Sequence, residues 1–162
     1  MLKKINKIKI VKNYNVNIQL LSNTIDKIIS KVFKLKLNFF YEIIFLTSSE
    51  MLKLNKNTRN KNYVADVITI SFLEHKDNDK NTESLLLIPL LGEIYLCLNK
   101  IKKNAKKYNV SFLSELSRMY IHGIMHLLDF DHEKSTIIEY LTLEIQDKIN
   151  KKVLEQYKKY EK

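Results

Sequence analysis

Three of the chain's four histidines stand close together in the sequence, at positions 122, 126 and 132. Residues four apart lie one turn above each other on an α-helix, so His122 and His126 can direct two imidazoles at a common atom. His132 cannot join them from the same helix face, and it reaches them only if the chain turns after Leu128. The spacing therefore predicts a helix that ends in a turn, with three imidazoles gathered beside that turn.

Such a trio has the composition of a catalytic metal site. Three neutral imidazoles and one open position describe catalytic zinc, whereas a structural zinc site normally has a fourth protein ligand. Bound zinc lowers the pKa of water to about 7 and polarises a carbonyl or phosphoryl oxygen, so hydrolysis is the expected reaction class. The structural alternative is a pair of histidines on a solvated helix face and an unrelated histidine in a turn.

The residue after the first histidine argues against one class of zinc hydrolase. Zinc proteases with histidines four apart carry a glutamate at that position, where it serves as the general base. This chain has Gly123 there, which has no side chain to take a proton. Peptide hydrolysis by that mechanism is therefore disfavoured.

Size and composition favour one domain in a reducing compartment. The chain has 162 residues, of which 45% are hydrophobic, and we expect residues 1–162 to form a single domain. Cys97 is the only cysteine, which excludes an internal disulfide and a multi-cysteine zinc module. The chain shows neither a signal peptide nor an apolar stretch of about 20 residues that could span a bilayer. We therefore expect a soluble, cytoplasmic protein without a membrane partner.

The chain is strongly basic, with 28 Lys and Arg against 18 Asp and Glu and a net charge of +10. A positive charge favours polyanionic partners such as nucleic acid. However, Arg59 and Arg118 are the only arginines, and the many lysines, asparagines and isoleucines share A/T-rich codons. A biased genome composition explains the charge about as well as selection for RNA binding.

Hydrophobic periodicity predicts an ordered mixture of strands and helices. The expected strands are Ile8–Val16, Phe39–Thr47, Val64–Phe72 and Gly92–Leu98. The expected helices are Ile18–Val32, Ser48–Lys56, Asn99–Tyr108, Ser111–Leu128 and a last helix that follows Thr136. These elements predict an α/β (α+β) fold with a small mixed sheet of about four strands, several helices and a zinc site at the end of a central helix.

Two helices have faces that can be assigned from the sequence. On the helix Ser111–Leu128, one side should dock on the sheet while the histidine side lines a cleft. The docking side contains Leu113, Leu116, Tyr120, Ile124 and Leu127, and the opposite side contains Glu115, Arg118, His122 and His126. The expected inner face of the last helix contains Ile138, Leu141, Ile145, Ile149 and Val153.

Several segments resemble one known family, the YbeY endoribonucleases or ribosomal RNA maturation factors. The stretch HGIMHLLDFDH at 122–132 resembles the family's histidine motif, H-G-x-x-H-L-x-G-Y-D-H. Leu54-Asn55 followed by Arg59 resembles its L-N-x-x-x-R segment. The segments ADVI at 65–68 and LGEI at 91–94 resemble its T-D-V-L and L-G-D-I strands. The matches occur in the family's order and cover about half of the chain.

The resemblance implies a site and a function. It implies one zinc ion held by His122, His126 and His132, and Arg59 as the catalytic or substrate-contacting cation. It implies single-strand-specific RNA cleavage on the small ribosomal subunit, in maturation of the 16S rRNA 3′ end and in ribosome quality control. Without the resemblance, the sequence favours the interpretation of Arg59 as an exposed cation at a helix end.

Five residues of the motif regions depart from the family pattern, among them Thr69-Ile70 in place of a Ser-Phe pair. Asp129 replaces a glycine at a turn where a positive φ is expected, Phe130 replaces a tyrosine, and Ala65 replaces a threonine. None of these changes removes an expected zinc ligand. They do bear on the geometry of the turn and on the catalytic rate.

Two other functions fit the same residues. In a non-catalytic ribosome-associated assembly factor, the metal would brace the turn and the basic surface would hold rRNA with a steep salt dependence. A zinc hydrolase of another substrate class would keep the three ligands and act on a different bond. An RNA cleavage assay separates both from an endoribonuclease.

Overall fold

The structure, a computed structural model, describes residues 2–6, 14–35, 40–72, 90–130 and 136–161. Within these ranges the chain forms four strands and five helices. In chain order they are β1 (Leu2–Asn6), α1 (Ile18–Val32), β2 (Phe40–Phe45), α2 (Ser48–Arg59), β3 (Val67–Ser71), β4 (Leu90–Leu96), α3 (Leu98–Lys107), α4 (Phe112–Leu127) and α5 (Thr136–Tyr160). Among these helices, none has the length and apolar character needed to cross a membrane.

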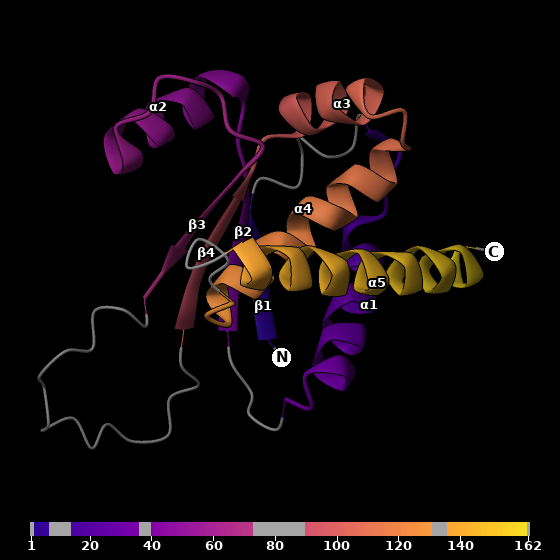
Figure 1. Cartoon of the computed structure of the whole chain (residues 1–162). Helices are drawn as coiled ribbons and strands as arrows, with labels where there is room; N and C mark the ends of the chain where they lie inside the picture. The colour runs from indigo at the N-terminus through magenta and orange to yellow at the C-terminus, as the bar shows by residue number, and fades with distance from the viewer. Residues whose placement is uncertain (1, 7–13, 36–39, 73–89, 131–135, 162) are drawn as a thin grey trace, which may run out of the picture.

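The described strands form one mixed sheet in the order β1-β2-β4-β3. β1, β2 and β4 run parallel, and β3 runs antiparallel to β4. α4 packs against β3 and β4, while α5 packs against both α4 and α1 (Figure 1). The expected α/β architecture, with a small mixed sheet and several helices, is confirmed.

α4 is the central helix of the core. Leu116, Tyr120, Ile124 and Leu127 are buried, as their spacing predicts, whereas Leu113 is only partly buried. Burying a side chain of this size stabilises a fold by about 1.5–3 kcal/mol. Because α3, α5 and the sheet all contact α4, the end of α4 that carries the histidines has a fixed direction.

Tyr120 adds polar contacts to this apolar packing. Its hydroxyl lies 2.5 Å from Ser22 Oγ on α1 and 2.9 Å from the Tyr41 hydroxyl on β2. The Tyr41 hydroxyl in turn donates to Asp26 Oδ1 at 2.7 Å. Burial raises the pKa of both tyrosines, so both stay protonated and able to donate. These bonds connect α4 to α1 and to the sheet.

The chain's two glycines both lie where α4 meets β4. A Cβ on Gly123 would stand 2.6 Å from Ile94 Cγ2, so a side chain there would push the helix away from the strand. Gly92 has a φ of +151°, and a Cβ there would stand 2.1 Å from the carbonyl oxygen of Ile70. The residue that follows the first histidine is therefore a glycine because of helix–sheet packing.

The prediction of a strand at Ile8–Val16 is wrong for the residues of this range that the structure describes. Residues 14–16 are not part of a strand, residues 8–13 lie outside the described ranges, and the described N-terminal strand is β1. The Tyr14 ring stacks on Phe112 at 4.8 Å, and its hydroxyl donates to Asn99 Oδ1 at 2.6 Å. Tyr14 and Val16 thus pack against the core from a segment that is not a strand. Their alternation with the exposed Asn15 has the same pattern as a half-buried strand.

The inner face expected for the last helix is partly wrong. Leu141 is 50% exposed, whereas Ile149 and Val153 are buried as expected and Ile145 is partly buried. The middle of α5 instead buries polar residues, namely Thr142, Gln146 and Asn150. The physical reason is that this stretch packs against α4, where Gln146 meets His122 and Asn150 Nδ2 donates to the Ser114 carbonyl. The side chain of Ile138 lies outside the described residues.

Candidate metal centre

His122 and His126 face each other on the last two turns of α4. Their Nε2 atoms are 3.1 Å apart, and the ring planes are inclined by 85°. Two imidazole ligands of one tetrahedral zinc ion, each bound at about 2.0–2.1 Å, have nitrogens about 3.3–3.4 Å apart. At 3.1 Å the two nitrogens are within hydrogen-bond distance of each other, and a separation only slightly larger would suit two ligands of one ion.

A glutamine on α5 fixes the tautomer of His122. Gln146 is fully buried, and its Oε1 lies 2.8 Å from His122 Nδ1. Because an amide oxygen only accepts, Nδ1 carries the proton and Nε2 keeps its lone pair. Metal-ligating histidines ordinarily donate their second ring N–H to such an acceptor. The chemistry of these donors thus fits a zinc ion or a similar divalent ion.

The sequence pattern did not identify Gln146 as a residue of the site. It lies on the same face of α5 as Ile149 and Val153, which are three and seven residues further on. A polar residue in line with an apolar stripe is the signal that could have identified it. What it contacts depends on how α5 crosses α4, which no local pattern specifies.

The turn after α4 has the hydrogen bonds of a Schellman motif. The Phe130 N–H donates to the Met125 carbonyl at 3.0 Å, and the Asp129 N–H donates to the His126 carbonyl at 3.1 Å. Asp129 has a φ of +61°, which confirms the positive φ expected where the family has glycine. The Phe130 ring then packs on Phe33 with ring centroids 4.6 Å apart. The chain accordingly turns directly after the helix, as the histidine spacing requires.

His132 lies outside the described residues, as does the isolated His75. Within the described ranges, no group of three His, Cys, Asp or Glu side chains could hold a metal ion. The structure therefore brings two of the three expected ligands together, and the description stops at Phe130, two residues before the third. The role of His132 remains a prediction.

Arg59 is the last residue of α2, and its side chain is exposed. Among the contacts between described residues, none connects Arg59 to His122 or His126. Its motif neighbour Asn55 is buried and donates from Nδ2 to the Tyr63 carbonyl at 2.9 Å. This bond shapes the loop that follows α2, so the L-N-x-x-x-R segment contains a structural residue as well as the expected cation.

A second arginine lies on the histidine side of α4. Arg118 stands one turn before His122 and binds the carboxylate of Glu115 with two hydrogen bonds, of 2.9 and 2.7 Å. Glu115 is only 2% exposed. The bonds to Glu115 raise the pKa of Arg118, and the charges of Asp147 and Asp66 raise it further. The guanidinium is thus held in an ion pair with Glu115, on the turn of α4 that precedes His122.

Comparison with known proteins agrees with the motifs. The sequence model of the family "Endoribonuclease YbeY" matches residues 5–157. The chain is 46% identical over 135 residues to Endoribonuclease YbeY of Mycoplasmoides gallisepticum, covering 83% of this chain and 77% of that protein. It is 32% identical over 143 residues to Endoribonuclease YbeY of Mycoplasma pneumoniae, covering 88% and 85% of the two chains.

A solved structure shares the fold. The solution structure of a Thermotoga maritima protein superposes with a TM-score of 0.61 at 23% identity, covering 99% of this chain and 93% of that one. The fold similarity extends over almost the whole chain, and the family match covers nearly as much. The resemblance seen in the histidine motif is thereby confirmed, and so is the expectation of an enzyme: the chain belongs to the YbeY family of endoribonucleases, hydrolases that cleave RNA.

Proposed function

We propose that this protein is a zinc-dependent endoribonuclease that cleaves single-stranded RNA in rRNA processing. Its expected partner is the rRNA of the small ribosomal subunit in the cytoplasm, with roles in maturation of the 16S rRNA 3′ end and in ribosome quality control. Family membership supports RNA cleavage. The observation that carries the metal is the 3.1 Å between Nε2 of His122 and Nε2 of His126, together with the acceptor that Gln146 provides.

In this proposal His122, His126 and His132 hold one zinc ion. When bound, zinc supplies a Lewis acid that polarises a phosphoryl oxygen and lowers the pKa of water. Gln146 keeps the His122 ring in the orientation and tautomer that present Nε2. The turn at Asp129 ends α4 before His132, as a third ligand from outside the helix requires.

The cations of the site would act on the RNA phosphate. A guanidinium can bind a phosphate with two parallel hydrogen bonds and stabilise charge that develops in the transition state. Arg59 ends α2 with an exposed side chain, which a ligand in solution can reach. Arg118 already gives two of its donors to Glu115. Arg59 is therefore the better candidate for contact with the substrate.

The test replaces one ligand and compares it with a histidine outside the cluster. The His126→Ala variant should bind less than one zinc ion per chain and should lose cleavage of single-stranded RNA by at least about 100-fold, because a catalytic metal supplies several kcal/mol. The His75→Ala variant is the matched control and should keep both properties. Metal content and cleavage that are both unchanged in His126→Ala would contradict the proposal.

Cleavage with and without metal separates an enzyme from a binding factor. Removal of zinc with a chelator should abolish cleavage, and added zinc should restore it. Binding of RNA without cleavage above the metal-free control would instead indicate an assembly factor with a structural metal.

A further inference from the structure

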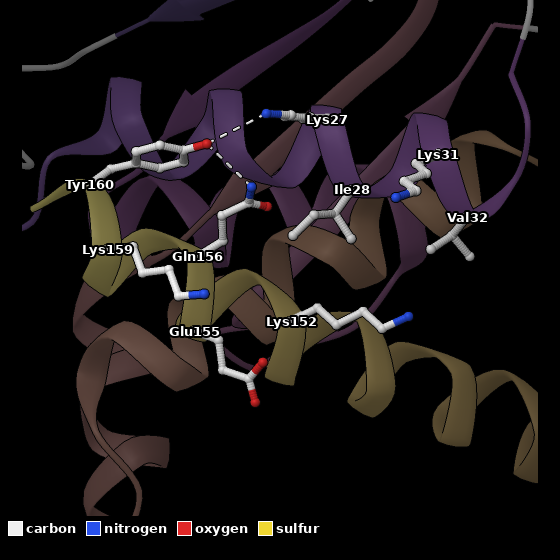
Figure 2. Close-up of a pocket in the computed structure, with 9 residues that line it drawn as sticks. All are labelled: Lys27, Ile28, Lys31, Val32, Lys152, Glu155, Gln156, Lys159 and Tyr160. Carbon is white, nitrogen blue, oxygen red and sulfur yellow. Dashed lines mark hydrogen bonds between the residues drawn. The ribbon is translucent and has the colours of Figure 1, made fainter.

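A groove outside the histidine site lies between α1 and α5. Its volume is about 600 Å³, within the range of about 300–1,000 Å³ that is usual for ligand sites. Figure 2 shows side chains from both helices along it. The lining residues are Lys27, Ile28, Lys31, Val32, Lys152, Glu155, Gln156, Lys159 and Tyr160.

Four exposed lysines give the groove its charge, two from α1 and two from α5. Within the described part of the chain, no ion pair neutralises any of them. Glu155 is the one acidic lining residue, and it points away from the contact between Lys27 and Tyr160 (Figure 2). The groove therefore carries an excess of positive charge, which attracts a polyanion.

An aromatic ring stands at one end of the groove. Tyr160 is 53% exposed, and its hydroxyl accepts hydrogen bonds from Gln156 Nε2 at 3.2 Å and Lys27 Nζ at 3.4 Å. These two bonds lower the pKa of Tyr160 and hold its ring in place (Figure 2). Exposed aromatic rings next to cations are the surfaces on which unpaired bases stack. Ile28 and Val32 add apolar surface between the lysines.

We propose that the α1–α5 groove binds single-stranded RNA, with its lysines on the phosphates and Tyr160 as a stacking surface for a base. The choice of RNA rests on the proposed function. The combination of lysines with an exposed ring favours a nucleotide chain over an acidic peptide, which needs only the charge.

The groove is placed to bind the same strand as the histidine site. α5 supplies Gln146 to the histidines and Lys152 and Lys159 to the groove. At a rise of about 1.5 Å per residue, the two lysines lie about 9–20 Å along the helix from Gln146. The two lysines lie about 120–140° round the helix from the buried Gln146, so a strand bound at both places would pass round α5 as well as along it.

The test compares two double variants of the same helix. Lys152→Gln with Lys159→Gln removes the two α5 charges of the groove. Lys151→Gln with Lys158→Gln removes two exposed lysines with the same spacing, about 100° round the helix. Binding of a fluorescein-labelled single-stranded RNA of about 12 nucleotides, within the usual site sizes, is measured by anisotropy in chelator, where metal-dependent cleavage does not interfere.

The salt dependence gives the decisive readout. Each phosphate contact contributes about 0.7 to the slope of log K against log salt for a single strand, so the groove variant should lose about 1.4 in slope and about 25-fold in affinity at 0.1 M salt. The control variant should keep the wild-type slope. Equal slopes and affinities for the groove variant and the wild type would overturn the groove proposal, whether or not the protein cleaves RNA. Altered slopes in a protein that never cleaves RNA would uphold the groove and overturn the proposed function.

Discussion

The orientation of His122 depends on a side chain from another helix. Gln146 lies on α5, and its amide oxygen accepts the proton of His122 Nδ1 at 2.8 Å. Its burial is complete, so water cannot replace the amide as an acceptor. The orientation of the histidine pair on α4 is therefore coupled to the packing of α5.

Replacement of this glutamine separates packing from hydrogen bonding. Gln146→Leu keeps an apolar volume at the position but leaves Nδ1 without its acceptor, and zinc affinity should fall about 10–100-fold. Gln146→Glu keeps an acceptor and should retain affinity close to that of the wild type. Zinc titration of both variants checks this expectation. An affinity in Gln146→Leu equal to that of the wild type would show that His122 needs no partner.

The end of α4 shows how one element creates the site. The helix stops because Asp129 adopts the left-handed region and its N–H, with that of Phe130, satisfies the last carbonyls. The pairing of His122 with His126 needs the helix, and the predicted role of His132 as a third ligand needs the helix to stop. Aspartate tolerates a positive φ better than most residues, but less well than glycine.

The turn predicts opposite effects for two small substitutions. Asp129→Gly should raise the free energy of unfolding by about 1 kcal/mol, because glycine has no Cβ to strain at this φ. For a chain of this size the melting temperature should rise by about 2–4 °C. Asp129→Ala should lower the melting temperature, since alanine lacks the local hydrogen bonding with which aspartate tolerates a positive φ. Thermal unfolding of both variants tests the turn, and a lower melting temperature for Asp129→Gly would contradict it.

For the molecule as a whole, periodicity predicted most helices to within a few residues. The apolar spacing along Ile18–Val32 reproduces α1, and the apolar side of α4 is buried as expected. The sequence also predicted the positive φ at Asp129. These features are local, because each depends on residues within a turn or two of the same helix.

Features that depend on contacts between distant elements could not be predicted. Tyr14 packs on Phe112, almost a hundred residues later, so its alternation with Val16 looked like a strand. The polar face of α5 turns inward because α4 offers His122 as a partner for Gln146. Local hydrophobic pattern favoured Leu141 instead, which is exposed. Of the site, the histidine pair was evident from spacing, whereas its buried acceptor depended on tertiary packing.

Zinc titration of the full-length chain, with and without the His132→Ala substitution, tests the three-histidine centre most directly. His132 is the expected ligand that the described residues do not include. The wild type should bind one zinc ion, and loss of the third imidazole should weaken binding at least about 100-fold, because an open catalytic site relies on three protein ligands. Binding in His132→Ala with wild-type stoichiometry and affinity would contradict the proposed centre.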